Sequence, residues 1–110
     1  PMEPESPDNY MPEVQAKFPG GEAALLQFIS RNLKYPEIAQ EQELQGTVVL
    51  NIKVDVDGLV SDVKIEKSLS RECDQAAMDV VRKLPRFIPA KENGRPVPVW
   101  FRLPLRFRIQ

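Results

Sequence analysis

The chain has 110 residues, 42% of them hydrophobic, with 15 basic and 16 acidic residues and a formal net charge of −1. This is the size of one domain with a packed core, and the balanced charge does not favour nucleic acid as a partner. Histidine is absent and Cys73 is the single cysteine, so the commonest general base and metal ligand are missing. We therefore predict a protein that is not an enzyme and that uses no metal or cofactor.

The first 21 residues carry five of the eleven prolines and end in Gly20-Gly21. Such a segment resists helix formation and is typical of an extended tether. We interpret residues 1–13 as the flexible end of a proline-rich linker and residues 14–110 as the domain, with Val14–Phe18 lying against it. A start at Pro1 favours a fragment of a longer chain. No apolar run approaches the length of a transmembrane helix.

A first helix is predicted from Glu22 to Leu33, because apolar residues recur there at spacings of three and four. Pro36 ends this segment, since the residue before a proline is disfavoured in helical geometry. Pro36 is also a suitable first residue for a short second helix that extends to about Gln42.

A β-hairpin follows. Residues 47–56 alternate in polarity, which predicts a strand whose inward side chains are Val48, Leu50, Ile52, Val54 and Val56. Asp57-Gly58 predicts a tight primed turn, in which both central residues need a positive φ. The return strand is expected over about Leu59–Ser68, with Val63 and Ile65 pointing inward.

The remaining elements are a helix and a strand. Arg71–Leu84 carries an apolar stripe at helical spacing that includes Cys73, with Ser70 as a candidate cap. A turn is predicted at Asn93-Gly94. The final segment, from Val97 to Ile109, alternates throughout and is expected to be the longest strand. The order predicts an α+β fold with two layers, a three-stranded antiparallel sheet packed against two helical segments.

The last strand has the clearest functional content. Pro98 and Pro104 share an outward register with Trp100, Arg102 and Arg106. Proline cannot donate to a ladder, so this strand is expected to have at least one edge partly free. Prolines and charges protect sheet edges against aggregation, and an open edge also accepts an extended peptide by β-augmentation. The pattern alone leaves both interpretations open.

Several short motifs, in their order across about 75 residues, resemble the TonB C-terminal domain family. They are Tyr35-Pro36, Gly46-Thr47-Val48, Val54-Asp55-Val56-Asp57-Gly58, Asp74-Gln75-Ala76-Ala77, Phe87-Ile88-Pro89-Ala90, Gly94 and Pro104-Leu105-Arg106-Phe107. The leader Phe18-Pro19-Gly20-Gly21 is similar to the form common in Bacteroidetes members.

The resemblance implies a periplasmic domain of an energy-transducing protein anchored in the inner membrane of a Gram-negative bacterium. It implies two sets of partners. One is the TonB box of TonB-dependent outer-membrane transporters, bound by strand addition. The other is ExbB and ExbD, reached through an N-terminal part of the protein, so that the proton-motive force drives uptake of siderophores or other nutrients.

The resemblance also implies which residues meet the peptide, namely the Tyr-Pro motif and the final strand, Val97–Arg108. The expected contacts are Lys34, Tyr35, Pro36, Val97, Val99, Trp100, Phe101, Arg102, Leu103, Leu105 and Arg106. The chain departs from the family pattern at residues 32–34, where better-known members have glutamine and proline before Tyr-Pro. It also departs at residues 84–86, where many members have a tryptophan.

Three alternatives remain at this stage. The domain could be the periplasmic tail of a TonB-fused membrane receptor or peptidase, or a TolA-like envelope scaffold. A small carboxylate enzyme is disfavoured by the missing histidine. An exposed last strand could also pair with its own copy, which would give a homodimer of the isolated domain.

Overall fold

The structure is a computed structural model that describes residues 12–109. Its elements are, in chain order, α1 (Glu22–Asn32), α2 (Glu37–Glu41), β1 (Gly46–Val54), β2 (Val60–Lys67), α3 (Arg71–Arg82), β3 (Ala90–Glu92), β4 (Arg95–Val97) and β5 (Val99–Phe107). The predicted linker, residues 1–13, lies outside the described residues except for Pro12 and Glu13. No described helix has the length and apolar character needed to cross a membrane.

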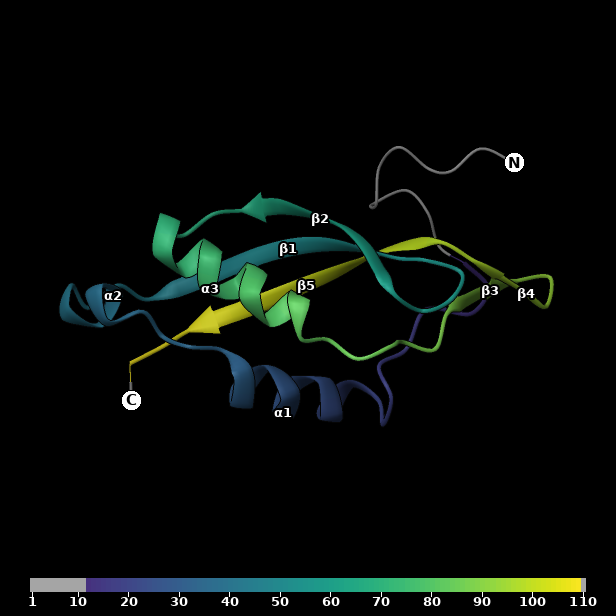
Figure 1. Cartoon of the computed structure of the whole chain (residues 1–110), viewed down its shortest axis with the longest axis horizontal. Coiled ribbons are helices and arrows are strands. Elements are labelled where there is room, and N and C mark those ends of the chain that lie inside the picture. Colours follow the sequence, from purple (N-terminus) through teal and green to yellow (C-terminus); the bar gives the residue numbers. More distant parts are fainter. Residues whose placement is uncertain (1–11, 110) are drawn as a thin grey trace.

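A three-stranded antiparallel sheet with strand order β2-β1-β5 forms the centre of the domain (Figure 1). β1 pairs with β5 without interruption, from Gly46 opposite Phe107 to Val54 opposite Val99. The inward side chains of β1 are completely buried, as their alternation predicts; they are Val48, Leu50, Ile52 and Val54. The predicted α+β fold is confirmed.

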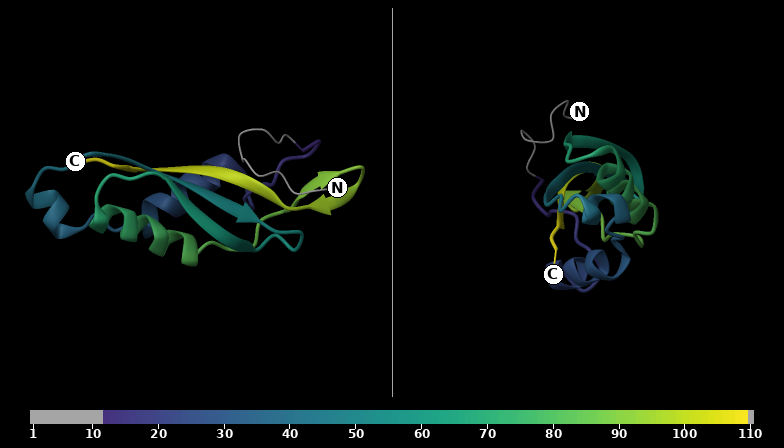
Figure 2. Two further views of the ribbon diagram at one scale, coloured as in Figure 1. Left: turned by 90° about the horizontal axis from the view of Figure 1, so that it is seen from above. Right: turned by 90° about the vertical axis from the view of Figure 1, so that its left-hand side faces the viewer.

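The two longer helices take different positions against this sheet. α3 packs in front of the strands, and α1 runs alongside β5 at the border of the sheet (Figures 1 and 2). The predicted cap of α3 is present, because the Ser70 hydroxyl accepts a hydrogen bond of 3.0 Å from the Cys73 N–H. Cys73 itself is fully buried in the core. α1 buries Leu25 and Ile29 and leaves a space beside β5.

The connection between β1 and β2 differs from the predicted tight turn. Five residues, 55–59, link the strands, and only Gly58 among them has a positive φ, at 85°, whereas Asp57 does not. The Gly58 N–H donates to the Asp55 carbonyl over 2.9 Å, which closes an ordinary four-residue turn. The reason for the longer loop is tertiary, because the Gly58 carbonyl accepts a hydrogen bond from the Phe87 N–H.

The predicted final strand is divided at Pro98. β4 ends at Val97, which pairs with Ala90 of β3, and β5 begins at Val99. A proline has no N–H for the ladder, so the break falls where the chain lacks a donor. β5 has nine residues, as many as β1, and is therefore not the longest strand. The prediction that Val97 belongs to the last strand is wrong.

One inward assignment needs correction, because Val56 lies in the loop and is 49% exposed. Ile65 pairs with Leu50 and shares its inward face as predicted, and it is 46% exposed because β2 is an edge strand. On the outward side of β1, Val49 and Asn51 are buried. β1 is the central strand, so long side chains of both neighbouring strands cover its outward residues.

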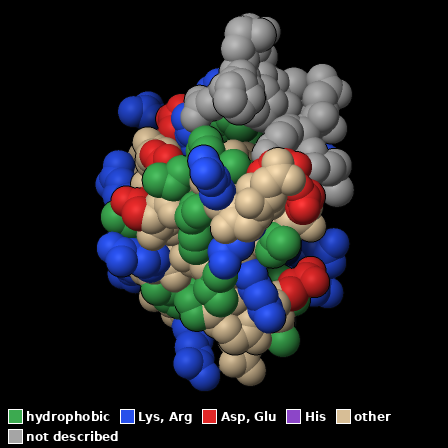
Figure 3. Space-filling model, turned by 90° about the vertical axis from the view of Figure 1, so that its right-hand side faces the viewer, with side chains coloured by type: hydrophobic (Ala, Val, Ile, Leu, Met, Phe, Trp, Pro, Cys, Tyr) green, Lys and Arg blue, Asp and Glu red, His purple; other side chains and the backbone are tan. Residues whose placement is uncertain are grey.

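The β3–β4 hairpin has the turn that was predicted at Asn93-Gly94. This turn is of the primed kind, which was expected at residues 57–58 instead. Asn93 and Gly94 link the strands directly, and both have a positive φ, 50° and 75°. The N-terminal segment pairs with this hairpin through bridges of Val14 with Lys91 and of Lys17 with Ile88. Figure 3 looks onto this end and shows hydrophobic side chains among lysines and arginines.

Candidate functional site

The outer edge of β5 is one of the two borders of the sheet, and β2 forms the other. β5 pairs with β1 on one side, and within residues 12–109 no backbone hydrogen bond occupies its other side. Pro104 stands inside the uninterrupted ladder, so we infer that its nitrogen faces the open edge, where no ladder bond is lost. The N–H of Ile109, in the opposite register, points towards β1 and donates to Gln45 Oε1 over 3.0 Å.

This register determines what the edge offers to a partner. Residues of even number in β5 share the orientation of Pro104, because backbone groups alternate in direction along a strand. The open edge therefore presents the N–H and carbonyl groups of Trp100, Arg102 and Arg106, and the carbonyl alone of Pro104. These groups are hydrogen-bonding atoms without a strand partner, and they can accept an added strand.

A groove of about 340 Å³ separates this edge from α1. Its walls are largely apolar and come from three parts of the chain: the segment before α1, α1 itself, and β5. The side chains that form the apolar wall opposite β5 are Ala16, Phe18, Leu25, Leu26 and Ile29. Lys17 and Glu22 add a charge of each sign to the same wall.

Four aromatic rings hold the walls of the groove together. The Phe18 ring lies 5.7 Å from that of Phe28 and 5.6 Å from that of Phe87. Phe87 in turn meets Phe101 of β5, with ring centroids 5.7 Å apart. This series of ring contacts, one tilted and two edge-on, connects the N-terminal segment, α1 and β5 through the core. The width of the groove thus depends on Phe18, a residue outside every helix and strand.

Tyr35 lies at the other end of β5. Its ring packs edge-on against Phe107 at 5.6 Å, and its hydroxyl donates to the Leu44 carbonyl. Desolvation, and to a smaller degree the Cys73 thiol, raise the pKa of the Tyr35 phenol, which remains a hydrogen-bond donor at neutral pH. A second hollow of about 390 Å³ at this end is lined by Tyr35, Arg106 and Phe107 among others. Tyr35 and the edge of β5 are therefore neighbours.

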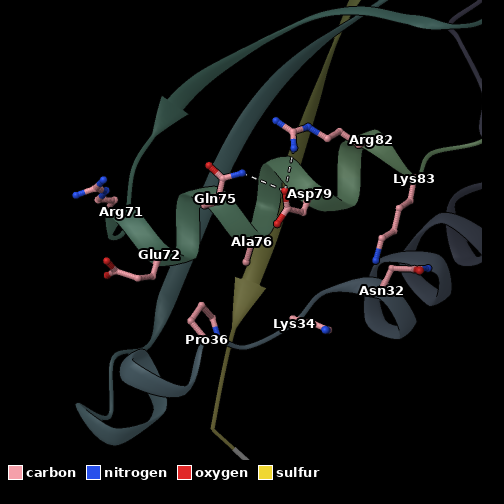
Figure 4. A pocket seen from close by; sticks show the side chains of 10 residues that line it. All are labelled: Asn32, Lys34, Pro36, Arg71, Glu72, Gln75, Ala76, Asp79, Arg82 and Lys83. Carbon is pink, nitrogen blue, oxygen red and sulfur yellow. Dashed lines mark hydrogen bonds and ion pairs between the residues drawn. The ribbon is translucent and has the colours of Figure 1, made fainter.

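Lys34 and Pro36 do not join this edge. Both line a separate hollow of about 690 Å³ between α3 and the segment that follows α1 (Figure 4). The α3 wall carries charges of both signs, and Asp79 is bonded there to Arg82 at 3.4 Å and to Gln75 at 3.0 Å. No residue of β5 lines this hollow, although it is larger than the groove.

The other predicted contacts divide between two faces of β5. Val99, Leu103 and Leu105 are buried in the core, and as odd-numbered residues they direct their backbone groups towards β1 rather than towards the open edge. Trp100, Arg102 and Arg106 point away from the core, and Phe101 and Leu103 line the groove; Val97 belongs to the hairpin. The groove wall from Ala16 to Ile29 was missed by the sequence-based prediction, and the apolar residues beside Gly20-Gly21 were the available signal.

An α+β domain with an open sheet edge and an apolar groove beside it has the geometry of a strand-binding module. Comparison with known families identifies the family of the chain. Residues 31–109 match the family described as Gram-negative bacterial TonB protein C-terminal. The match covers more than half of the chain, which therefore belongs to this family. The family is one of non-enzymatic interaction proteins.

Curated relatives give the same result. The chain is 39% identical over 77 residues to Protein TonB of Xanthomonas campestris, a match that covers 69% of this chain and 34% of the relative. It is 34% identical over 77 residues to Protein tonB2 of Pseudomonas aeruginosa, covering 69% and 28%. This chain thus spans about a third of the length of these relatives.

Two NMR solution structures of the Helicobacter pylori TonB-CTD share the fold. One superposes with a TM-score of 0.60 and 23% identity, covering 84% of this chain and 87% of the other. The second has a TM-score of 0.59 and 22% identity, covering 77% and 89%.

Proposed function

We propose that this domain binds an extended peptide by strand addition at the open edge of β5. The proposed peptide is the TonB box of a TonB-dependent outer-membrane transporter. The observation that carries the proposal is the unpaired edge of β5 beside an apolar groove. Membership of the TonB C-terminal family supports the identity of the partner.

The groove suggests which peptide would fit. Side chains of an added strand alternate between its two faces. Those on the core side would enter the groove against Phe18, Leu25 and Ile29, so apolar residues are expected at alternate positions of the peptide. Those on the other side would lie beside Arg102 and Arg106, where polar or acidic residues are favoured.

The expected affinity is modest. A short peptide gains only a handful of ladder hydrogen bonds, each contributing roughly 0.5–1.5 kcal/mol net. Pro104 removes one donor from the edge, which lowers this number further. Weak, reversible binding suits a coupler that must release its partner after each cycle.

For the whole protein we infer anchoring in the inner membrane, with this domain in the periplasm. ExbB and ExbD would supply energy from the proton-motive force, and pulling on the bound peptide would open the transporter for nutrient uptake. The support is the similarity to TonB proteins over the C-terminal third of their length. Transport assays of the full-length protein in cells that lack their own transducer test this part separately.

A backbone substitution tests strand addition most selectively. Arg106→Pro deletes one edge N–H, whereas Arg106→Ala removes the same side chain and keeps that N–H. We expect Arg106→Pro to bind a fluorescent TonB-box peptide at least ~3-fold more weakly than Arg106→Ala, as expected for one lost hydrogen bond. Anisotropy titrations with the box peptide and a scrambled control measure this difference. Equal affinities of the two variants would contradict pairing at this edge.

A further inference from the structure

The side of the central sheet opposite α3 carries a concentration of positive charge. This side, here called the open sheet face, is defined by register, since residues paired across strands point to the same face. Asn51 pairs with Lys64 and Arg102, and the neighbouring pairs bring Lys53 beside Trp100 and Thr47 beside Arg106. The five cations of the open sheet face are Lys53, Lys64, Lys67, Arg102 and Arg106.

Only two carboxylates oppose these cations on the three strands. Glu66 reaches across the open sheet face and bonds to Arg102 Nε at 3.0 Å and to Asn51 Nδ2 at 3.3 Å. Asp62 accepts a hydrogen bond from the neighbouring Val63 N–H. The face therefore has an excess of positive charge, although the whole chain has a net charge of −1. Charge is segregated to this side of the molecule.

The side chains of the open sheet face form a broad layer rather than a pocket. Val49 and Asn51 of β1 are buried, although none of the helices within residues 12–109 lies on this side of the sheet (Figures 1 and 2). Their neighbours across the strands are Lys64, Lys67, Arg102 and Pro104, and we infer that the aliphatic stems of these lysines and of Arg102 cover them and hold the charged groups outward. The Lys64 ammonium lies 4.9 Å from the centre of the Trp100 ring.

These features distinguish between anionic partners. Stacking of nucleic-acid bases needs accessible aromatic faces, and this face has the single ring of Trp100, with the Lys64 ammonium over one side of it. A protein partner would be expected to place an anchor side chain in a pocket, and neither the groove beside β5 nor the hollows at Tyr35 and at α3 are lined mainly by this face. A flat array of cations with one half-exposed tryptophan matches the headgroup region of an anionic bilayer.

We propose that the open sheet face docks the domain on a membrane surface rich in anionic phospholipids. The lipid phosphates would pair with Lys64, Lys67 and Arg106, and Trp100 would lie at headgroup level. This surface uses side chains, whereas the outer edge of β5 offers backbone groups, although Trp100, Arg102 and Arg106 belong to both; docking on a membrane needs no peptide. A bound peptide would extend the sheet sideways and leave the open sheet face accessible.

Two charge-reversal pairs with equal change in net charge test the proposal. Lys64→Glu/Lys67→Glu alters the open sheet face, and Arg71→Glu/Arg82→Glu alters exposed positions of α3 on the opposite side. Co-sedimentation uses vesicles of phosphatidylcholine alone and of an equimolar mixture with phosphatidylglycerol, at low and high salt. Circular dichroism confirms that both variants are folded before binding is compared.

The wild-type domain is expected to bind the phosphatidylglycerol vesicles at low salt and to lose binding at high salt. Lys64→Glu/Lys67→Glu should lower the partition coefficient at least ~30-fold, from the contribution of each basic residue near an anionic surface. The α3 pair should change it less than ~3-fold. Brominated phosphatidylglycerol should also quench Trp100, the single tryptophan.

Three results would overturn this assignment. The first is absence of wild-type binding to the anionic vesicles at low salt. The second is an equal loss of binding in both charge-reversal pairs, which would indicate a net-charge effect without a defined face. The third is tighter binding to polyglutamate or single-stranded RNA at matched charge concentration, which would assign the face to an acidic protein or a nucleic acid.

Discussion

Gly58 and Gly94 offer a matched pair for measuring how the turns support the fold. Both have a positive φ, 85° and 75°, so an alanine at either position meets the same backbone strain of roughly 1–2 kcal/mol. They differ in their surroundings. A Cβ at Gly58 would lie 2.0 Å from the Phe87 carbonyl oxygen and 2.8 Å from Arg86 Cγ, whereas a Cβ at Gly94 has no neighbour within 4 Å.

The difference in surroundings sets the expected magnitude. Gly58→Ala must push the loop away from Phe87 and break the 2.8 Å hydrogen bond between the Phe87 N–H and the Gly58 carbonyl. Lost hydrogen bonding and partial exposure of Phe87 add to the strain, so we expect a loss of about 3 kcal/mol in the free energy of unfolding. Gly94→Ala should lose about 1 kcal/mol.

Urea unfolding followed by the fluorescence of Trp100 measures both variants against the wild type. The midpoint should fall further for Gly58→Ala, with little change in the slope of the transition. Because Phe87 contacts Phe18 and Phe101, Gly58→Ala should also weaken peptide binding, whereas Gly94→Ala should not. Equal losses of stability in the two variants would refute the contact between the loop and Phe87 as the reason for glycine at 58.

Three further outcomes follow from the same contacts. Phe18→Ala should lower the free energy of unfolding by about 3 kcal/mol, and it should weaken binding of the TonB-box peptide because it opens one wall of the groove. Unchanged binding would show that Phe18 is not part of the site. Ser70→Ala should cost about 1 kcal/mol in urea unfolding through loss of the α3 cap, and Ser70→Asp should restore it. Pro104→Ala should raise the affinity for the TonB-box peptide by ~2- to 10-fold in anisotropy titrations, because it adds an edge N–H. Weaker binding would mean that the nitrogen of residue 104 faces β1.

Local patterns were sufficient for most of the fold. The apolar stripe of α3, its cap at Ser70 and the alternation of β1 are short-range features, so they could be predicted from neighbouring residues. The length of the loop at Gly58 could not be predicted in this way, because it is set by a contact with Phe87, which is distant in sequence. The same applies to Asn51, whose burial comes from side chains of both adjacent strands.

The candidate site was only partly predictable for a related reason. The edge of β5 was indicated by Pro104 and by the arginines that share its register. The groove wall opposite β5 was not indicated by the sequence. Leu26 lies off the apolar stripe of α1 and lines the groove only after the chain has folded. Pro36 belongs to the Tyr-Pro motif and Lys34 directly precedes it, but both line a different hollow from the one beside Tyr35.

The most direct test of the account is an NMR titration of the isotope-labelled domain with a TonB-box peptide, combined with amide hydrogen exchange. We predict that the amides of Arg102 and Arg106 exchange rapidly in the free domain and become protected when the peptide binds, with shifts extending to Tyr35. The amides of Leu103 and Leu105, which face β1, should be protected in both states. Absence of new protection at Arg102 and Arg106 at saturating peptide, or protection confined to β2, would contradict strand addition at β5.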